Sequence, residues 1–128
     1  MKNEFTLLIA DSNPHVRSFL QRELAADGYQ VKSTGTAKAI FVVLWADEAP
    51  DLLIMDLDMP LEIGLEVLRR LYNFVPRTPV IIYTHLTEYQ HHPQVQWVDA
   101  FIEKNGSPIP LKEVIADVLH SYYAHCID

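Results

Sequence analysis

The stretch that decides the fold is LLIMDLDMPLEIG, residues Leu52–Gly64. Its first four residues are apolar without interruption, which is typical of a strand that is covered on both faces of a parallel sheet. The run then ends at two acids, Asp56 and Asp58, which are followed by Pro60. A carboxylate at the end of a buried strand costs several kcal/mol unless another group compensates it. The rest of the sequence therefore has to supply that compensation.

Strand-like and helix-like segments alternate along the chain on both sides of this stretch. The predicted strands are residues 5–10, 30–34, 52–56, 78–84 and 100–104. The predicted helices are one that starts at Pro14 after a cap at Ser12 or Asn13, and residues 36–49, 65–74 and 110–125. Pro93 interrupts the segment before the last strand, so only a short or distorted element is expected there. The alternation predicts an α/β fold, a doubly wound parallel sheet of five strands whose ligands bind at the carboxyl ends.

Composition excludes several classes of protein. The 128 residues fit one domain, and a net charge of −7 argues against a nucleic-acid-binding surface, which needs clustered Lys and Arg. The single cysteine, Cys126, cannot form a disulfide framework, so a cytoplasmic location is expected. The sequence contains no signal peptide and no apolar stretch long enough to span a membrane.

Four segments together carry a resemblance to a known family. They are LLIADSNP at 7–14, PDLLIMDLDMPLEIGLEVLRRL at 50–71, TPVIIYTH at 78–85 and DAFIEKN at 99–105. The chain resembles the receiver domain of two-component response regulators over essentially its whole length. The resemblance implies a flavodoxin-like (βα)₅ fold with strand order 2-1-3-4-5 and a single receiver domain over residues 1–128. It also implies a phosphorelay protein and not an enzyme, with at most self-catalysed phosphoryl transfer and autodephosphorylation.

The resemblance also implies a role for each acidic, hydroxyl and basic residue at the strand ends. Asp56 would be the phosphoacceptor, which takes its phosphoryl group from a sensor histidine kinase or a phosphotransfer protein. Thr84 would donate a hydrogen bond to the phosphoryl group, and Lys104 would pair with it. Mg²⁺ would be the cofactor, held by Asp11, Asp56 and the backbone carbonyl of Asp58. Taken alone, each of these residues has an ordinary structural role, and only the four positions together favour such a site.

Three positions near the expected site depart from the family pattern. Ser12 stands where a second acid is usual, so it would be a weak ligand and Mg²⁺ binding is expected to be weak. His85 follows the threonine where a small residue is usual, and it would either gate access to the site or point to solvent. Asn105 replaces a proline after Lys104, so the peptide bond between them is expected to be trans.

The expected output surface differs from the family pattern as well. By resemblance, Phe101 is the aromatic switch residue, which would rotate inward when Thr84 moves. Pro93 and Trp97 argue against the ordinary homodimer built on the fourth helix, fifth strand and fifth helix, although a homodimer remains compatible with the sequence. The downstream partner would be another protein or an output domain, and direct binding of nucleic acid is not expected.

Two alternative functions stay open at this point. A degenerate metal site at Ser12 is also compatible with a receiver-like protein-interaction module that is never phosphorylated. The DxD pattern of Asp56 and Asp58 is similar to the nucleophile motif of haloacid-dehalogenase enzymes, in which Asp58 would be the general acid. Against the enzyme, that motif belongs on a first strand, and no acidic pair follows Lys104 at a strand end.

Overall fold

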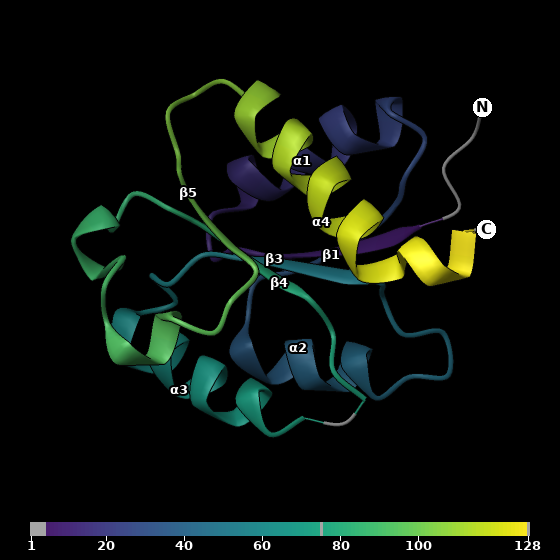
Figure 1. Ribbon diagram of the computed structural model, residues 1–128. Coiled ribbons are helices and arrows are strands. Elements are labelled where there is room, and N and C mark those ends of the chain that lie inside the picture. The colour runs from purple at the N-terminus through teal and green to yellow at the C-terminus, as the bar shows by residue number, and fades with distance from the viewer. Residues whose placement is uncertain (1–4, 75, 128) are drawn as a thin grey trace.

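One parallel sheet organises the molecule (Figure 1). The computed structural model describes residues 5–74 and 76–127, with side chains as far as Ala124, so the side chain of Cys126 lies outside the described part. The sheet has five strands in the order β2-β1-β3-β4-β5. Its strands are β1 Thr6–Ala10, β2 Gln30–Thr34, β3 Leu52–Met55, β4 Val80–Thr84 and β5 Ala100–Glu103. The predicted α/β class, strand number and strand order are all confirmed.

Helices cover both faces of the sheet, and each pair of helices closes one hydrophobic core. The helices are α1 Pro14–Ala26, α2 Ala37–Leu44, α3 Leu61–Tyr72 and α4 Ile109–Ile127. Figure 1 shows α1 and α4 on one face and α2 and α3 on the other. Alternate residues of the central strands enter the two cores: Leu8, Leu53 and Ile82 on the α2–α3 side, and Leu7, Ile54 and Ile81 on the α1–α4 side.

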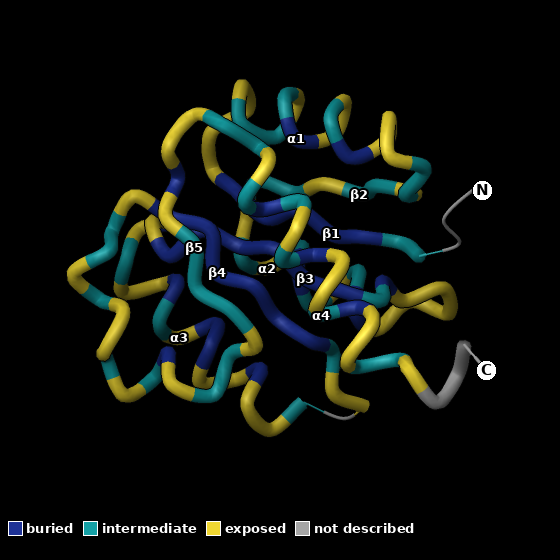
Figure 2. The backbone as a smooth tube through the Cα atoms, turned by 45° about the horizontal axis from the view of Figure 1, so that its top comes forward, coloured by how far each residue is buried: buried dark blue, intermediate teal, exposed yellow. Residues whose placement is uncertain are grey.

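Burial follows strand position in the sheet. Every residue of β3 and β4 is buried, and four of the five residues of β1 are buried. The edge strand β2 has no buried residue, in agreement with its more polar sequence. In Figure 2 the central strands form the continuous dark layer between the exposed helix surfaces. The uninterrupted apolar sequence of β3 therefore has its expected cause, which is coverage on both faces.

The start of α1 confirms the predicted helix signal. Asn13 is the N-cap residue, and its side-chain oxygen accepts a hydrogen bond from the backbone N–H of His15 at 2.9 Å. Pro14 takes the first helical position. Proline has no backbone N–H, and an N–H at this position would have no acceptor within the helix, so nothing is lost. The cap fixes the direction in which the chain leaves the end of β1.

Helix α2 is shorter than predicted. The prediction extended it to residue 49, but the helix ends at Leu44, and Ala46 N–H donates to Val43 O in a tighter turn. Two features of the sequence explain the early end. Asp47 and Glu48 would place negative charge at the negative end of the helix dipole, and the residue before Pro50 is disfavoured in helical conformation.

Helix α3 begins earlier than predicted, at Leu61 and not at residue 65. The backbone N–H groups of Ile63 and Gly64 both donate to Pro60 O at 2.9 Å, which starts the helix directly after the proline. Gly64 lies inside the helix. A Cβ at this position would overlap the carbonyl oxygen of Leu57. The glycine thus allows α3 to approach the segment that follows β3.

The connection between β4 and β5 confirms the expectation of a short, distorted element. It consists of two 3₁₀ helices, Thr87–Tyr89 and Pro93–Val95, without an α-helix between them. Pro93 starts the second one, where the side chain of His92 caps it. This segment still closes the core on its side of the sheet, because Val95 is buried against it.

We expect Gly64→Ala to destabilise the fold by about 1–3 kcal/mol, because α3 has to move away from the Leu57 carbonyl and its core contacts loosen. Urea denaturation followed by circular dichroism measures the effect. Ser18→Ala is the control, since Ser18 is exposed on α1 and the same change there removes no contact. Equal stability of the two variants would show that α3 does not depend on this close approach.

Candidate functional site

Four polar side chains meet at the carboxyl edge of the sheet. Asp11 follows β1, Asp56 follows β3, Thr84 ends β4 and Lys104 follows β5. Within the described part of the chain, these four are the only polar or charged residues that are buried. The strand order makes β1 and β3 neighbours and places β4 beside β3, so residues far apart in sequence become adjacent. The structure thus brings together all four side chains that the sequence singled out.

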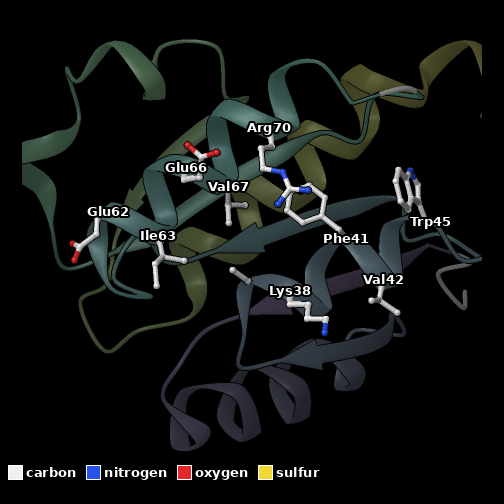
Figure 3. A pocket seen from close by; sticks show the side chains of 10 residues that line it. Lys38, Phe41, Val42, Trp45, Glu62, Ile63, Glu66, Val67 and Arg70 are labelled. Carbon is white, nitrogen blue, oxygen red and sulfur yellow. The ribbon is translucent and has the colours of Figure 1, made fainter.

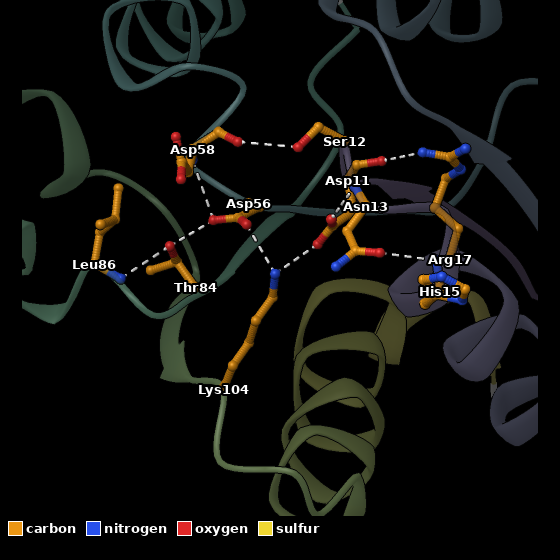
Figure 4. A network of polar contacts seen from close by, with 10 residues as sticks. All are labelled: Asp11, Ser12, Asn13, His15, Arg17, Asp56, Asp58, Thr84, Leu86 and Lys104. Carbon is orange, nitrogen blue, oxygen red and sulfur yellow. Dashed lines mark hydrogen bonds and ion pairs between the residues drawn. The ribbon is translucent and has the colours of Figure 1, made fainter.

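Lys104 is the centre of the cluster (Figure 4). Its Nζ lies 2.7 Å from Oδ2 of Asp11 and 2.8 Å from Oδ2 of Asp56. One buried ammonium group therefore bridges two buried carboxylates, and these are separated from it by 93 and 48 residues along the chain. Two carboxylates so close together repel each other, and the shared cation removes that repulsion.

The second oxygen of Asp56 is also fully engaged. Its Oδ1 accepts a hydrogen bond from Thr84 Oγ1 at 2.5 Å and another from the backbone N–H of Asp58 at 3.1 Å. Thr84 Oγ1 accepts in turn from the backbone N–H of Leu86 at 3.2 Å. Every hydrogen-bonding partner of this carboxylate is a donor, so the surroundings favour its ionised form.

These contacts shift the pKa of both charged partners. Burial raises the pKa of the Asp56 carboxyl, but the hydrogen bonds from Lys104, Thr84 and Asp58 outweigh burial and hold that pKa below its usual value. Burial lowers the pKa of Lys104, but Asp11 and Asp56 outweigh it and raise that pKa above its usual value. Both groups are therefore charged at neutral pH. Asp56 contributes stability that is lost as pH falls through its depressed pKa, and Lys104 contributes stability that is lost as pH rises through its elevated pKa.

The oxygen donors at this edge fit a magnesium ion, although the described residues contain no group of three or more His, Cys, Asp or Glu side chains placed to hold a metal. The donors present are the carboxylates of Asp11 and Asp56 and the carbonyl of Asp58. The hydroxyl of Ser12 donates to that carbonyl at 3.3 Å, so it lies beside the same donors. Oxygen ligands of this kind, completed by waters, suit Mg²⁺, but two carboxylates supply less charge than three.

His85 and Phe101 lie around the cluster and not in it. His85 is exposed and, with Lys104 and Tyr83, lines a cavity of about 330 Å³ between β4 and the start of α1. It therefore lines the same cavity as Lys104, and its gating role stays a prediction. Phe101 is half-buried on β5 and packs against the core on the α2–α3 side. Met59–Pro60 is the only cis peptide among the described residues, so the Lys104–Asn105 bond is trans, as predicted.

The side chain of Asp58 is exposed and points away from Asp56 (Figure 4), which removes the geometric basis for a general acid at this position. The DxD residues also follow β3 and not the first strand. Among the described residues, His85, His91 and His92 take part in no metal-binding cluster. None of the helices in the described ranges is long and apolar enough to cross a membrane.

Arg17 is a site residue that the sequence interpretation missed. Its Nη1 donates to the backbone carbonyl of Asp11 at 2.6 Å, which holds the end of β1 in place. Gly35 leaves room for the guanidinium, since a Cβ there would lie 2.7 Å from Arg17 Nη1. Arg17 follows Asp11 by six residues on the next helix, and an arginine at that spacing carries no signal in a single sequence. Only the folded structure, in which α1 packs against the loop after β2, shows that Arg17 reaches the Asp11 carbonyl.

Comparison with known proteins agrees with this geometry. The family model described as the response regulator receiver domain matches residues 7–116. The DNA-binding transcriptional regulator NtrC of Azospirillum brasilense is 36% identical over 78 residues, which cover 60% of this chain and 16% of that protein. NtrC of Bradyrhizobium sp. (strain RP501 Parasponia) is 29% identical over 116 residues, covering 88% of this chain and 23% of that protein. The chain therefore spans less than a quarter of the length of these relatives.

Solved structures show the same fold. Response regulator TrrA of Thermotoga maritima, in complex with Mg²⁺ and BeF, has a TM-score of 0.80 and 25% identity, covering 91% of this chain and 98% of that one. The same regulator in complex with histidine kinase ThkA also has a TM-score of 0.80 and 25% identity, covering 93% of this chain and 99% of that one. A receiver protein of Burkholderia phymatum has a TM-score of 0.77 and 23% identity, covering 91% and 95%.

We expect Lys104→Met to lower the free energy of unfolding by about 3–5 kcal/mol at pH 7, because two buried carboxylates lose the cation between them. The loss should shrink below about pH 4, where Asp11 and Asp56 take up protons and their repulsion disappears. Urea denaturation at both pH values measures the difference.

Lys112→Met is the matched control for this experiment. Lys112 also contacts two acids, Glu23 at 3.2 Å and Asp27 at 3.4 Å, but these pairs are partly exposed. Its removal should cost less than about 1 kcal/mol and show little dependence on pH. An equal cost for the two lysines would contradict a stabilising role for the buried cluster.

Proposed function

Because the chain belongs to the response regulator receiver domain family of two-component signalling, we propose that Asp56 accepts a phosphoryl group from a phosphohistidine of a partner protein. The observation that carries this proposal is the convergence of Lys104 and Thr84 on the two oxygens of one buried, ionised carboxylate. We also propose that residues 1–128 make up one receiver domain. The kinase complex of the related TrrA supports a histidine kinase as the donor.

In the proposed reaction, an oxygen of Asp56 forms a bond to phosphorus while the bond from phosphorus to the histidine nitrogen breaks. The imidazole keeps the electron pair of the broken bond and takes up a proton. The depressed pKa of Asp56 keeps the nucleophile ionised at neutral pH, so no general base is needed.

Charge neutralisation by the remaining residues supports this transfer. Lys104, already 2.8 Å from Asp56, would pair with a phosphoryl oxygen, and the Thr84 hydroxyl would donate to another. Receiver domains bind Mg²⁺, and in this chain Asp11, Asp56 and the Asp58 carbonyl would hold the ion. When bound, Mg²⁺ supplies the further positive charge that phosphoryl transfer needs.

The same contacts support a switch. Thr84 Oγ1 bonds to Asp56 before phosphorylation, and a phosphoryl group on Asp56 would draw this hydroxyl toward a new position. Movement of Thr84 would open space beside β5, where Phe101 is half-buried, and Phe101 would rotate inward. The altered face would then be read by a downstream protein or output domain, in line with the greater length of the NtrC relatives.

A protein-interaction module without phosphorylation is the second candidate. Ser12 in place of an acid favours it, since the described site offers only two carboxylates for a metal. Lys104 favours it as well, because the ammonium already pairs with both carboxylates without an added ion. The two candidates differ in whether Asp56 reacts.

Incubation with Mg²⁺ and a small phosphodonor should add the mass of one phosphoryl group to the wild-type chain and none to Asp56→Asn. Intact-protein mass spectrometry measures the product. Asp58→Asn is the matched control and should react like the wild type, since its side chain is exposed and its carbonyl is retained. An unmodified wild-type chain at millimolar Mg²⁺ would favour the interaction module, and labelling of Asp56→Asn would place the reaction elsewhere.

Ser12→Asp should raise the affinity for Mg²⁺ by roughly tenfold or more, because a third carboxylate joins the donors beside the Asp58 carbonyl. Isothermal titration calorimetry of the two proteins measures the change. Ser12→Asn introduces a side chain of the same size as Ser12→Asp but without its charge. It should leave the affinity within about threefold of the wild type. If Ser12→Asp gains nothing, position 12 does not face the ion.

A further inference from the structure

Polar contacts hold Asp11 by its backbone and by both oxygens of its side chain. Its backbone N–H donates to Thr34 O at 3.1 Å, and its carbonyl accepts from Arg17 Nη1 at 2.6 Å. On the side chain, Oδ1 accepts from the backbone N–H of Asn13 at 2.9 Å, and Oδ2 accepts from Lys104 Nζ at 2.7 Å. Because Asp11 is buried with all these groups engaged, a shift of its backbone would also displace its carboxylate.

Of the two backbone contacts of Asp11, the one with Arg17 comes from a charged side chain. Arg17 lies in the first turn of α1, where its backbone N–H donates to Asn13 O at 3.1 Å. Its half-buried side chain reaches back to the end of β1 (Figure 4). In the described part of the chain no ion pair involves Arg17. A hydrogen bond from a charged donor is stronger than one between neutral groups, so this guanidinium is suited to hold a carbonyl in place.

Gly35, in the loop after β2, provides the space for the guanidinium. A Cβ at this position would lie 2.7 Å from Arg17 Nη1 and 3.2 Å from Arg17 Cζ. The φ of Gly35 is not positive, so its backbone also suits alanine. The guanidinium is the far end of a flexible side chain, so it would move aside in preference to the backbone. Alanine at position 35 would therefore break the contact with Asp11 at little cost to the fold and without removing the positive charge.

We propose that Arg17 is a positioning residue for Asp11 and that Gly35 is required for this role. The hydrogen bond to the carbonyl fixes the end of β1, so the Asp11 carboxylate stays turned toward Lys104. The consequence for Mg²⁺ rests on the proposed function, in which the same carboxylate is a ligand of the ion. Groups that orient a metal ligand commonly contribute about tenfold or more to metal affinity.

The charge of Arg17, taken alone, would have the opposite effect on a bound cation. Loss of a positive charge near the site would raise the affinity for Mg²⁺, because repulsion between the two cations is removed. Loss of a positioning contact should lower that affinity instead. The direction of the change therefore separates the two roles.

Two substitutions break the contact in different ways. Arg17→Ala removes the guanidinium and keeps a good helix-forming residue in α1, and Gly35→Ala displaces the guanidinium but retains it. Titration with Mg²⁺, followed by NMR of the ¹⁵N-labelled protein, should show binding about tenfold weaker in each variant. In the double variant Gly35→Ala should add no further loss, because it acts only through Arg17.

The amide proton of Asn13 gives a second measurement that needs no ion. This N–H donates to Asp11 Oδ1, so its chemical shift reports where the carboxylate lies. In the absence of Mg²⁺, both single variants should move the Asn13 amide proton to higher field, because the hydrogen bond lengthens. A role of Arg17 in stability alone would lower the midpoint of urea unfolding and leave this resonance in place.

Arg22→Ala is the matched control. Arg22 is exposed on the same helix, with its guanidinium 6.0 Å from the ring centre of Phe19. The same change there should alter neither the Mg²⁺ affinity nor the Asn13 resonance. Circular dichroism checks that each variant is folded, and Gly35→Ala keeps the test decisive if Arg17→Ala does not fold.

The possible outcomes separate this inference from the proposed function. A wild-type chain that binds no Mg²⁺ contradicts the proposed metal site, and the Asn13 resonance then decides the role of Arg17. Positioning by Arg17 is overturned if Arg17→Ala binds Mg²⁺ more tightly, or if neither variant moves the Asn13 resonance. It is also overturned if Gly35→Ala matches the wild type in both measurements, since the contact with the carbonyl then has no effect on the carboxylate.

Discussion

The ammonium group of Lys104, held between the carboxylates of Asp11 and Asp56, is the interaction on which the rest of the site depends. It joins the ends of β5, β1 and β3, which the strand order 2-1-3-4-5 brings to one edge of the sheet. Burial of a lone carboxylate would be costly, but the shared cation and the donors around Asp56 remove that cost. The acids at the end of an apolar strand are therefore compatible with a stable core.

The same arrangement that stabilises the fold leaves Asp56 ready for chemistry. Its carboxylate is ionised, oriented by Thr84 and the Asp58 N–H, and reached from solvent at the edge of the sheet. Receiver domains bind Mg²⁺. In this chain Ser12 donates to the Asp58 carbonyl, and Lys104 pairs with both Asp11 and Asp56.

Two parts of the surface on the same side of the sheet differ in what they leave exposed. Between β4 and β5 the chain makes only two 3₁₀ helices, packed through Val95 and around Trp97. On α2 and α3 an apolar groove remains open, bordered by Lys38 and Glu62 (Figure 3). A partner surface on α2–α3 would lie on the same side of the sheet as Phe101, whose ring packs into the same core. Phe101 on β5 therefore packs against the same core as the helices that carry the groove.

The sequence by itself determined the class of fold and the main members of the site. Unbroken apolar runs predicted the buried strands, and acids, a threonine and a lysine directly after those runs marked the edge where Asp11, Asp56, Thr84 and Lys104 meet. These four side chains lie close together because the carboxyl ends of parallel strands share one edge of the sheet. The ends of two helices were predicted less well. Helix α2 ends earlier than predicted and α3 starts earlier, and the start of α3 depends on the close packing of Gly64 against another segment.

Only the tertiary structure decided which groups bond to one another. It showed that a single ammonium serves both carboxylates, that Arg17 reaches the Asp11 carbonyl through the space left by Gly35, and that His85 lines a cavity together with Lys104. It also showed that Trp45 is exposed, which its apolar character alone does not indicate. Local sequence sets the tendency of each segment, whereas such contacts depend on how separate segments pack, and that information is shared among residues far apart in the chain.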